Sequence, residues 1–247
     1  MGTGTSTGVP AIGCECSVCK SSDPRNNRLR ASVLVTINDK NILIDTAPDL
    51  RQQALRYGFK RIDAVLYTHD HADHIHGIDE LRSFNFLQWS AIPIYAGRKV
   101  IERIKKSFMY IFEEQLEGGG KPVITLHEID SSFEAAGTRI EPLPVWHGSQ
   151  KIFGYKIGEF AYISDVSKIP DETITLIKNI KVVVLDALRE KEHSTHMNFS
   201  QAIETAKLIG AKRTLFTHMG HSVDHASTSA KLPPGMELAY DGLEIIL

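Results

Sequence analysis

A buried β-strand that runs directly into a cluster of histidines and aspartates is the feature that most constrains this fold. The segment IDAVLYT (62–68) has the apolar, β-branched composition of a buried strand, and HDHADHIH (69–76) follows it with four of the chain's eleven histidines. A loop at the end of a rigid strand can direct several side chains at one point. Imidazole and carboxylate groups together suit zinc, manganese or iron(II), whereas magnesium and calcium prefer oxygen ligands. The cluster therefore predicts a transition-metal site at a strand end.

The spacing of these ligands predicts more than one ion. The candidates in the cluster are His69, His71, Asp73 and His74. A polar helix start without any ligand is the alternative interpretation, and the density of ligating groups disfavours it. Four ligands this close in sequence cannot all surround one ion, which favours two ions side by side. Further candidates follow other predicted strands: His147 after IEPLPVW, Asp165 after FAYIS, and His218 after TLFT.

Predicted strands and helices interleave along the whole chain, without an internal repeat or a clear domain boundary. ASVLVTI and NILIDT, joined at Asn38-Asp39, and GYKIG with FAYIS predict two hairpins. A mixed sheet, or two sheets covered by helices, fits this order better than a purely parallel sheet. We therefore expect one domain of class α/β (α+β) over residues 1–247, with a loop at EGGGK (117–121).

Composition narrows the function classes. Hydrophobic residues make up 42% and charged residues 23%, which is typical of a globular protein, and the formal net charge of −2 provides no global positive field for nucleic acid. No apolar run approaches the length of a bilayer span and no secretory signal is present, so we expect a cytoplasmic location and no membrane partner. Three cysteines, all within residues 14–19, do not predict a disulfide framework.

The motifs THDHADH, His147, SDV (164–166) and FTH (216–218) resemble those of the metallo-β-lactamase-fold hydrolases, and the resemblance spans almost the whole chain. It implies a four-layer αββα sandwich of two mixed sheets flanked by helices. It also implies two divalent ions, Mn²⁺ or Zn²⁺, in the active site. By this resemblance His69, His71 and His147 hold one ion, Asp73, His74 and His218 hold the other, and Asp165 bridges both. Asp45, at the end of NILID, is then expected to orient a ligating histidine.

The N-terminal stretch GTGTSTGVPAIGCECSVCK resembles one branch of that family, which contains the phosphoribosyl cyclic phosphodiesterase of bacterial phosphonate breakdown. In that branch a cysteine loop and a later histidine hold a structural zinc ion. The matching residues here are Cys14, Cys16 and Cys19, in a loop at 13–20, and His221. A Cys₃His shell is closed and leaves no position for substrate. Relatives carry a short strand before the Gly-Thr-Gly turn, so we expect either a truncated sequence or a first sheet that lacks this strand.

The resemblance implies a metal-dependent phosphodiesterase that acts on a cyclic phosphate ester of a sugar or nucleotide through a metal-bridging hydroxide. Asp73 and Asp165 are expected to take part in catalysis as ligands. His196, in HSTHMNF, matches the histidine placed near the leaving group in that branch, and His193 competes with it for this role.

Three alternative functions stay open on the same fold. These are a transfer-RNA 3′-processing endonuclease, a thioester or lactone hydrolase, and a non-catalytic metal-binding carrier protein. The net charge of −2, and the lack of a long arm in the 17 residues between His147 and Asp165, disfavour the endonuclease. We therefore expect a small-molecule phosphodiester rather than nucleic acid as the partner, and a homodimer on the base rate of oligomers.

Overall fold

The computed structural model describes residues 1–114 and 120–247, which form two compact units. The inserted unit comprises Ser32–Arg139, and the flanking unit comprises Met1–Ala31 together with Ile140–Leu247. The expectation of a single domain stays a prediction. Most of the predicted loop at 117–121 lies outside the described residues.

The inserted unit contains a five-stranded mixed sheet in the order β1-β2-β3-β4-β5. Its strands are β1 (Val33–Ile37), β2 (Lys40–Ile44), β3 (Ala64–Leu66), β4 (Ile92–Ala96) and β5 (Ile124–Glu128). Strand β1 runs antiparallel to β2, and the later neighbours are parallel. Asn38 and Asp39 connect β1 to β2 with φ angles of 49° and 58°, as a two-residue hairpin turn of type I′ requires. The first predicted hairpin is confirmed.

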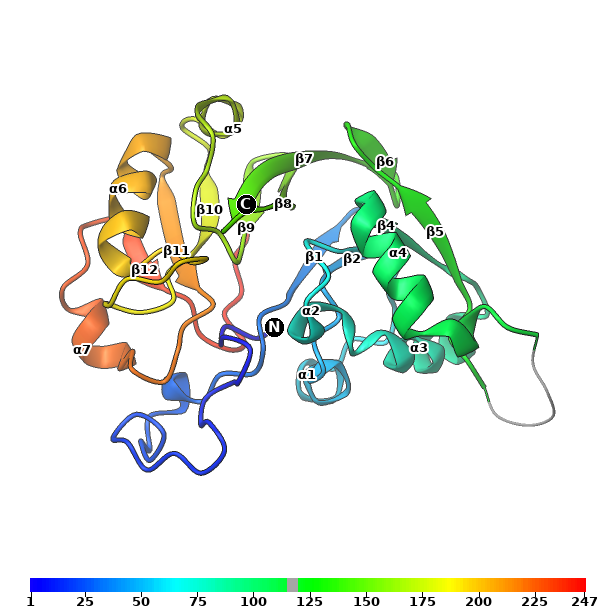
Figure 1. The fold of residues 1–247 in the computed structure, drawn as a ribbon, viewed down its shortest axis with the longest axis horizontal. Helices are drawn as coiled ribbons and strands as arrows, with labels where there is room; N and C mark the ends of the chain where they lie inside the picture. The colour runs from blue at the N-terminus through cyan, green and yellow to red at the C-terminus, as the bar shows by residue number, and fades with distance from the viewer. Residues whose placement is uncertain (115–119) are drawn as a thin grey trace. The chain divides into compact units, whose positions relative to one another are not determined.

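Four helices accompany this sheet (Figure 1). They are α1 (Leu50–Tyr57), α2 (Ala72–Ile75), α3 (Leu81–Gln88) and α4 (Arg98–Ser107), with the 3₁₀ turns η2 (Ile78–Glu80) and η3 (Met109–Ile111). Helix α4 packs against β5 and buries Val100, Ile101 and Ile104, which recur at helical spacing on one face. No helix in the described ranges is long and apolar enough to cross a membrane.

The flanking unit contains most of a second, seven-stranded mixed sheet in the order β12-β11-β10-β9-β8-β7-β6. Its strands are β7 (Thr138–His147), β8 (Gln150–Ile157), β9 (Phe160–Ile163), β10 (Val182–Asp186), β11 (Arg213–Thr217) and β12 (Met236–Leu238). The remaining strand, β6 (Phe133–Ala135), belongs to the inserted unit. Strands β7, β8 and β9 are antiparallel, which confirms the second hairpin, whereas β9 to β12 are parallel. The predicted architecture of two mixed sheets with flanking helices is confirmed.

The helices of the flanking unit fix the ends of these strands. They are η1 (Pro24–Asn26), α5 (Asp171–Leu176), α6 (Phe199–Ile209) and α7 (His225–Ser229). Helix α6 begins with a capping box, in which the Asn198 side chain accepts from the Gln201 N–H and the Gln201 side chain accepts from the Asn198 N–H. Phe199 and Ala202 then pack with strand residues such as Phe216 in one buried apolar cluster, which makes the strands a rigid support for the residues that follow them.

Candidate metal centre

In the inserted unit, two parallel strands end side by side and continue into polar residues. The register pairs Ile44 of β2 with Leu66 of β3, and the Asp45 N–H then donates to the Leu66 carbonyl at 2.9 Å. Asp45 has a φ of 64°, in the left-handed region that residues other than glycine seldom adopt, and its side chain is fully buried. The strand pairing therefore turns this carboxylate towards the segment that follows β3.

Asp45 organises the histidine loop. One carboxylate oxygen accepts the Thr68 N–H at 2.8 Å, and the other accepts both the Thr68 hydroxyl at 2.8 Å and His74 Nδ1 at 2.7 Å. Burial raises the pKa of Asp45, and the adjacent His74 and the hydrogen bonds from Thr68 oppose that shift. Because Nδ1 of His74 carries the shared proton, its Nε2 presents a lone pair, as in a carboxylate–histidine–metal arrangement. The hydrogen bond from His74 Nδ1 is the contact that the predicted role of Asp45, orienting a ligating histidine, requires.

The structure brings the four cluster residues together around this loop. His69 is fully buried with Nδ1 at 3.0 Å from the Thr68 hydroxyl, and its ring centroid lies 4.5 Å from that of His71 and 4.1 Å from that of His74. Helix α2 begins after His71, which places Asp73 and His74 in its first turn with 3.2 Å between Oδ2 and Nε2. Imidazole and carboxylate groups therefore converge in a small volume of this unit.

In the flanking unit, the carboxyl ends of three adjacent parallel strands lie next to one another. Asp165 follows β9, Asp186 ends β10 and His218 follows β11, and the strand register places these ends next to one another. All three side chains are buried, and Asp165 and His218 have φ angles of 58° and 60°. Asp165 Oδ1 lies 3.2 Å from His218 Nε2. Two predicted ligands thus meet within one unit.

His147, at the end of β7, is oriented by the backbone of a distant loop. Its Nδ1 donates to the Thr195 carbonyl at 2.8 Å, which leaves Nε2 as the ligating atom. Gly148 follows with a φ of 60°, and a Cβ at this position would lie 2.8 Å from the Thr195 Cγ2. A glycine is therefore required for the loop to approach His147 this closely.

Asp186 is a candidate functional residue that the sequence did not single out. Its Oδ2 lies 3.2 Å from His196 Nδ1 and accepts the N–H groups of Val166 at 3.2 Å and Met197 at 3.3 Å, while its Oδ1 lies 3.6 Å from His218 Nδ1. A signal was available, because Asp186 ends VVVLDA in the same strand-then-acid pattern as Asp45 and Asp165. One buried carboxylate therefore touches both the predicted proton donor and a predicted ligand.

The two histidines that compete for the acid role lie 5.0 Å apart between ring centroids and make different contacts. The His196 ring stacks on His218 with 5.0 Å between centroids and forms an edge contact with His147 at 4.8 Å. His193 instead accepts the Thr195 N–H at 3.3 Å and lies 3.2 Å from the Thr195 hydroxyl, within its own loop. Burial and the neighbouring His196 lower the pKa of His193. The contacts favour His196.

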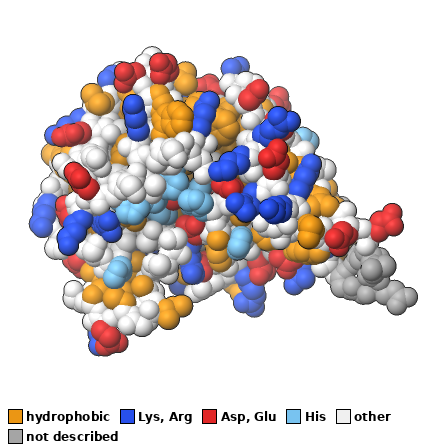
Figure 2. Space-filling view, viewed as in Figure 1, with side chains coloured by type: hydrophobic (Ala, Val, Ile, Leu, Met, Phe, Trp, Pro, Cys, Tyr) orange, Lys and Arg blue, Asp and Glu red, His pale blue; other side chains and the backbone are white. Residues whose placement is uncertain are grey.

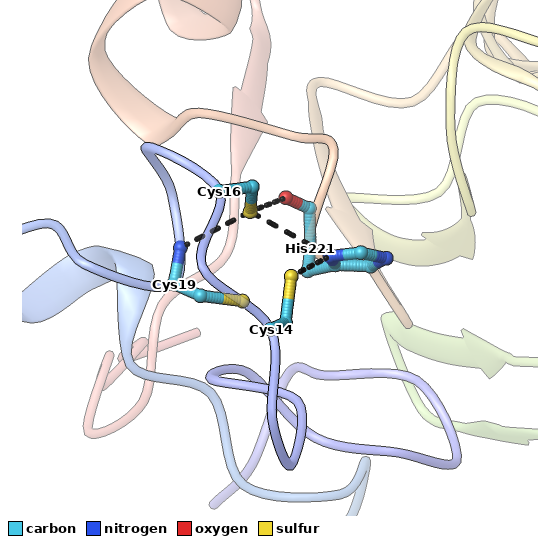
Figure 3. A group of neighbouring side chains, drawn as sticks. All are labelled: Cys14, Cys16, Cys19 and His221. Carbon is cyan, nitrogen blue, oxygen red and sulfur yellow. Dashed lines mark hydrogen bonds between the residues drawn. The ribbon is translucent and has the colours of Figure 1, made fainter.

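The cysteine loop and His221 form a second cluster, which lies entirely in the flanking unit (Figure 3). Nδ1 of His221 lies 3.2 Å from Cys14 Sγ and 3.6 Å from Cys16 Sγ, and the Cys19 N–H donates to Cys16 Sγ at 3.4 Å. The Cys19 N–H and His221 lower the pKa of Cys16 to about 6, whereas burial raises the pKa of Cys19 to about 11. The four ligand atoms lie within 4.8 Å of one another. Three sulfurs and one nitrogen in this arrangement suit a tetrahedral zinc ion.

Both kinds of cluster have donor sets that suit transition-metal ions. The histidine and aspartate clusters combine imidazole nitrogens with carboxylate oxygens, and the hydrogen bonds to Nδ1 of His74 and His147 direct the Nε2 atoms as ligands. These residues can therefore bind divalent metal.

Comparison with known proteins identifies the family. A family model for the beta-lactamase superfamily domain matches residues 40–219. The crystal structure of a diphosphatase from the PhnP family is 42% identical, with a TM-score of 0.93 over 100% of this chain and 95% of that chain. An octanoyltransferase from Porphyromonas gingivalis is 40% identical over 100% of this chain and 51% of its own length. A ribonuclease Z from Bradyrhizobium diazoefficiens is 30% identical over 55% of this chain and 46% of its own length.

The chain spans about half the length of the curated relatives it matches. The family model nevertheless covers most of the chain, and the diphosphatase structure matches all of it. The resemblance predicted from the histidine and aspartate motifs is confirmed. The chain therefore belongs to the beta-lactamase superfamily and has the metallo-β-lactamase fold.

Proposed function

We propose that the chain is a metal-dependent phosphodiesterase that hydrolyses a cyclic phosphate ester of a sugar or nucleotide. The observation that carries the proposal is the Asp186–His196 pair, which holds an ionisable imidazole against the candidate ligand His218. A proton donor at that position suits a reaction with a poor alkoxide leaving group. The 42% identity to a diphosphatase supports a reaction at phosphorus.

In this proposal the histidine and aspartate residues of each unit serve as ligands for divalent ions. The proposed ligands are His69, His71, Asp73 and His74 in the inserted unit, and His147, Asp165 and His218 in the flanking unit. Bound to these residues, Mn²⁺ or Zn²⁺ would neutralise charge on phosphoryl oxygens and would make a nucleophile available near neutral pH. Cys14, Cys16, Cys19 and His221 are assigned a separate, structural zinc ion.

The chain's own residues then position the substrate and move one proton. Asp186 accepts from Nδ1 of His196, which fixes the orientation of the ring. His196 Nε2 donates a proton to the departing alkoxide as the phosphorus–oxygen bond breaks. Asp45 keeps His74 in one tautomer and one orientation throughout.

A second candidate, thioester hydrolysis, is favoured by one comparison. The octanoyltransferase from Porphyromonas gingivalis matches all of this chain at 40% identity, although the match covers only 51% of that protein. A nucleophile activated for phosphorus also attacks a carbonyl carbon. Acyl substrates therefore belong in the test.

The test is hydrolysis by protein loaded with Mn²⁺ or Zn²⁺. The substrates are a ribose 1,2-cyclic phosphate, a 2′,3′-cyclic nucleotide, an aryl phosphodiester, an octanoyl thioester and a precursor transfer RNA. The His69→Ala variant removes a proposed ligand, and His127→Ala is the matched control on an exposed strand residue. Turnover of the cyclic phosphates that only His69→Ala abolishes is expected. Turnover of the thioester or the transfer RNA alone would overturn the proposal.

A further inference from the structure

We propose that a basic ridge on α4, defined as Lys99, Arg103 and Lys106, binds the backbone phosphates of a short single-stranded RNA whose terminal 2′,3′-cyclic phosphate is the group hydrolysed. This inference rests on the proposed function and deepens it by naming the substrate class. The whole-chain charge of −2 argues against nucleic acid only when charge is averaged over the molecule. The local distribution in the inserted unit differs from that average.

The ridge begins at the loop that carries the candidate ligands. Asp70 lies between His69 and His71 in the sequence and is 8% exposed. Lys99 Nζ lies 3.8 Å from one Asp70 carboxylate oxygen, and Arg103 Nε lies 3.3 Å from the other. These contacts place the two cations on the side of α4 that faces the histidine loop. A polymer with its end at this loop can therefore extend along α4.

The three cations continue along one face of the helix. Lys99, Arg103 and Lys106 follow an i, i+4, i+7 spacing, which aligns side chains on successive turns. Their backbone positions span about 10 Å at the rise of an α-helix. All three are exposed. The ridge is thus long enough to contact more than the phosphate that is hydrolysed.

The charge of this segment is strongly unbalanced. Five of the nine residues in 98–106 are lysine or arginine and only Glu102 is acidic, and Figure 2 shows lysine and arginine side chains gathered over α4. Lys105 and Lys106 form no ion pair with any acidic side chain of the described residues. A surface with surplus positive charge raises the local concentration of an anionic ligand.

Exposed apolar side chains follow the ridge directly. Met109, Tyr110 and Phe112 are 60%, 44% and 43% exposed. The Tyr110 hydroxyl donates to Asp79 at 2.6 Å, which holds the ring in one orientation. A positive track next to aromatic rings is the composition of surfaces that bind single-stranded nucleic acid, where bases stack on the rings. A mononucleotide is too short to use both features.

The experiment compares kcat/KM for a pentaribonucleotide that ends in a 2′,3′-cyclic phosphate with kcat/KM for the 2′,3′-cyclic mononucleotide. The ridge variant is Lys99→Gln/Lys106→Gln, and the matched control is Lys207→Gln/Lys212→Gln, which removes the same charge from exposed positions elsewhere. We expect the unmodified protein to prefer the pentamer by about tenfold or more, since stacking of one base contributes roughly that factor. The ridge variant is expected to lose this preference and the control to keep it.

Salt dependence supplies a second readout. Binding of a labelled pentamer product, measured by fluorescence anisotropy between about 50 and 200 mM salt, is expected to lose about 1.4 from the log–log slope in the ridge variant, at about 0.7 per lost phosphate contact. Equal kcat/KM for the two substrates, or an unchanged slope in the ridge variant, overturns the ridge proposal. Absence of turnover for both substrates instead overturns the proposed function, and the binding measurement then decides the ridge separately.

Discussion

His218 and His221 are three residues apart, yet their surroundings are opposite. His218 is 1% exposed, follows a central strand, and lies between the carboxylates of Asp165 and Asp186. His221 is exposed and faces the sulfurs of a surface loop. The first site is built on strand ends and the second on a loop without regular structure.

The difference reflects what each kind of ligand needs. A neutral imidazole must be turned by a second group before it can bind metal in a defined direction, and Asp45 and Thr195 provide that for His74 and His147. A cysteine carries its own charge once deprotonated, and the pKa of Cys16, lowered to about 6, already favours the thiolate. Rigid support on strand ends therefore accompanies the proposed catalytic centre, whereas the proposed structural site combines three cysteine sulfurs with His221 on loops without regular structure.

The largest effect is expected at the proton donor. His196→Gln should lower kcat by about 10² to 10⁴, because general acid catalysis is lost, while the metal content is unchanged. Steady-state kinetics and elemental analysis check the two halves of this statement. His193→Gln is the matched control in the same loop. A larger loss in His193→Gln than in His196→Gln would reverse the assignment.

The second-largest effect is expected from loss of the carboxylate of Asp45, which orients a candidate ligand. Asp45→Asn should weaken metal binding by about 10- to 100-fold, since the carboxylate that orients His74 is lost. Titration of metal-free protein followed by calorimetry measures the change. Asp39→Asn, in the exposed turn of the first hairpin, is the control. An unaltered affinity would show that strand-end ligands need no such partner.

Loss of a thiolate tests the loop-based site alone. Cys16→Ser is expected to reduce the bound zinc by one ion per chain and to lower the melting temperature, because metal binding contributes to folding there. The ions of the active site and the kcat of the remaining folded protein should stay close to those of the unmodified protein. Zinc analysis and thermal unfolding, each compared with Ser21→Ala, separate these effects. Retention of all the zinc would remove Cys16 from the proposed shell.

A third histidine of the same segment gives the smallest effect. His225 is 4% exposed, and burial together with Arg25 and Arg28 lowers its pKa to about 4. The unfolded chain binds a proton near pH 6.5. Between about pH 6.5 and 4 the unfolded state therefore binds more protons than the folded state. The contribution of His225 to the free energy of unfolding is fully present above this range, and roughly 2 kcal/mol of it is lost as the pH falls through the range. The free energy of unfolding, measured with denaturant at both ends of this pH range, should depend less on pH in His225→Gln than in the unmodified protein. An equal pH dependence in the two proteins would contradict the assignment of this effect to His225.

The candidate ligands could be predicted from the sequence because they share one pattern, a histidine or aspartate that follows a predicted strand. The ligand candidates follow strands as expected. Strands β6 and β12 were missed because each has only three residues, too few for an alternating pattern. Asp186 was missed because a single acid at a strand end has many meanings until its neighbours in space are known. The predicted homodimer and cytoplasmic location stay predictions.

The left-handed backbone at Asp45, Asp165 and His218 has a consequence for how metal enters the protein. Each of these conformations costs of the order of 1–3 kcal/mol and is maintained by the pairing of the strands before it. Metal binding then requires little rearrangement, because folding itself already provides the conformational free energy that orients these side chains. Mutations in the interior of the sheets, far from any ligand, should therefore weaken metal binding. The more they disturb the backbone conformation at the strand ends, the larger this effect should be.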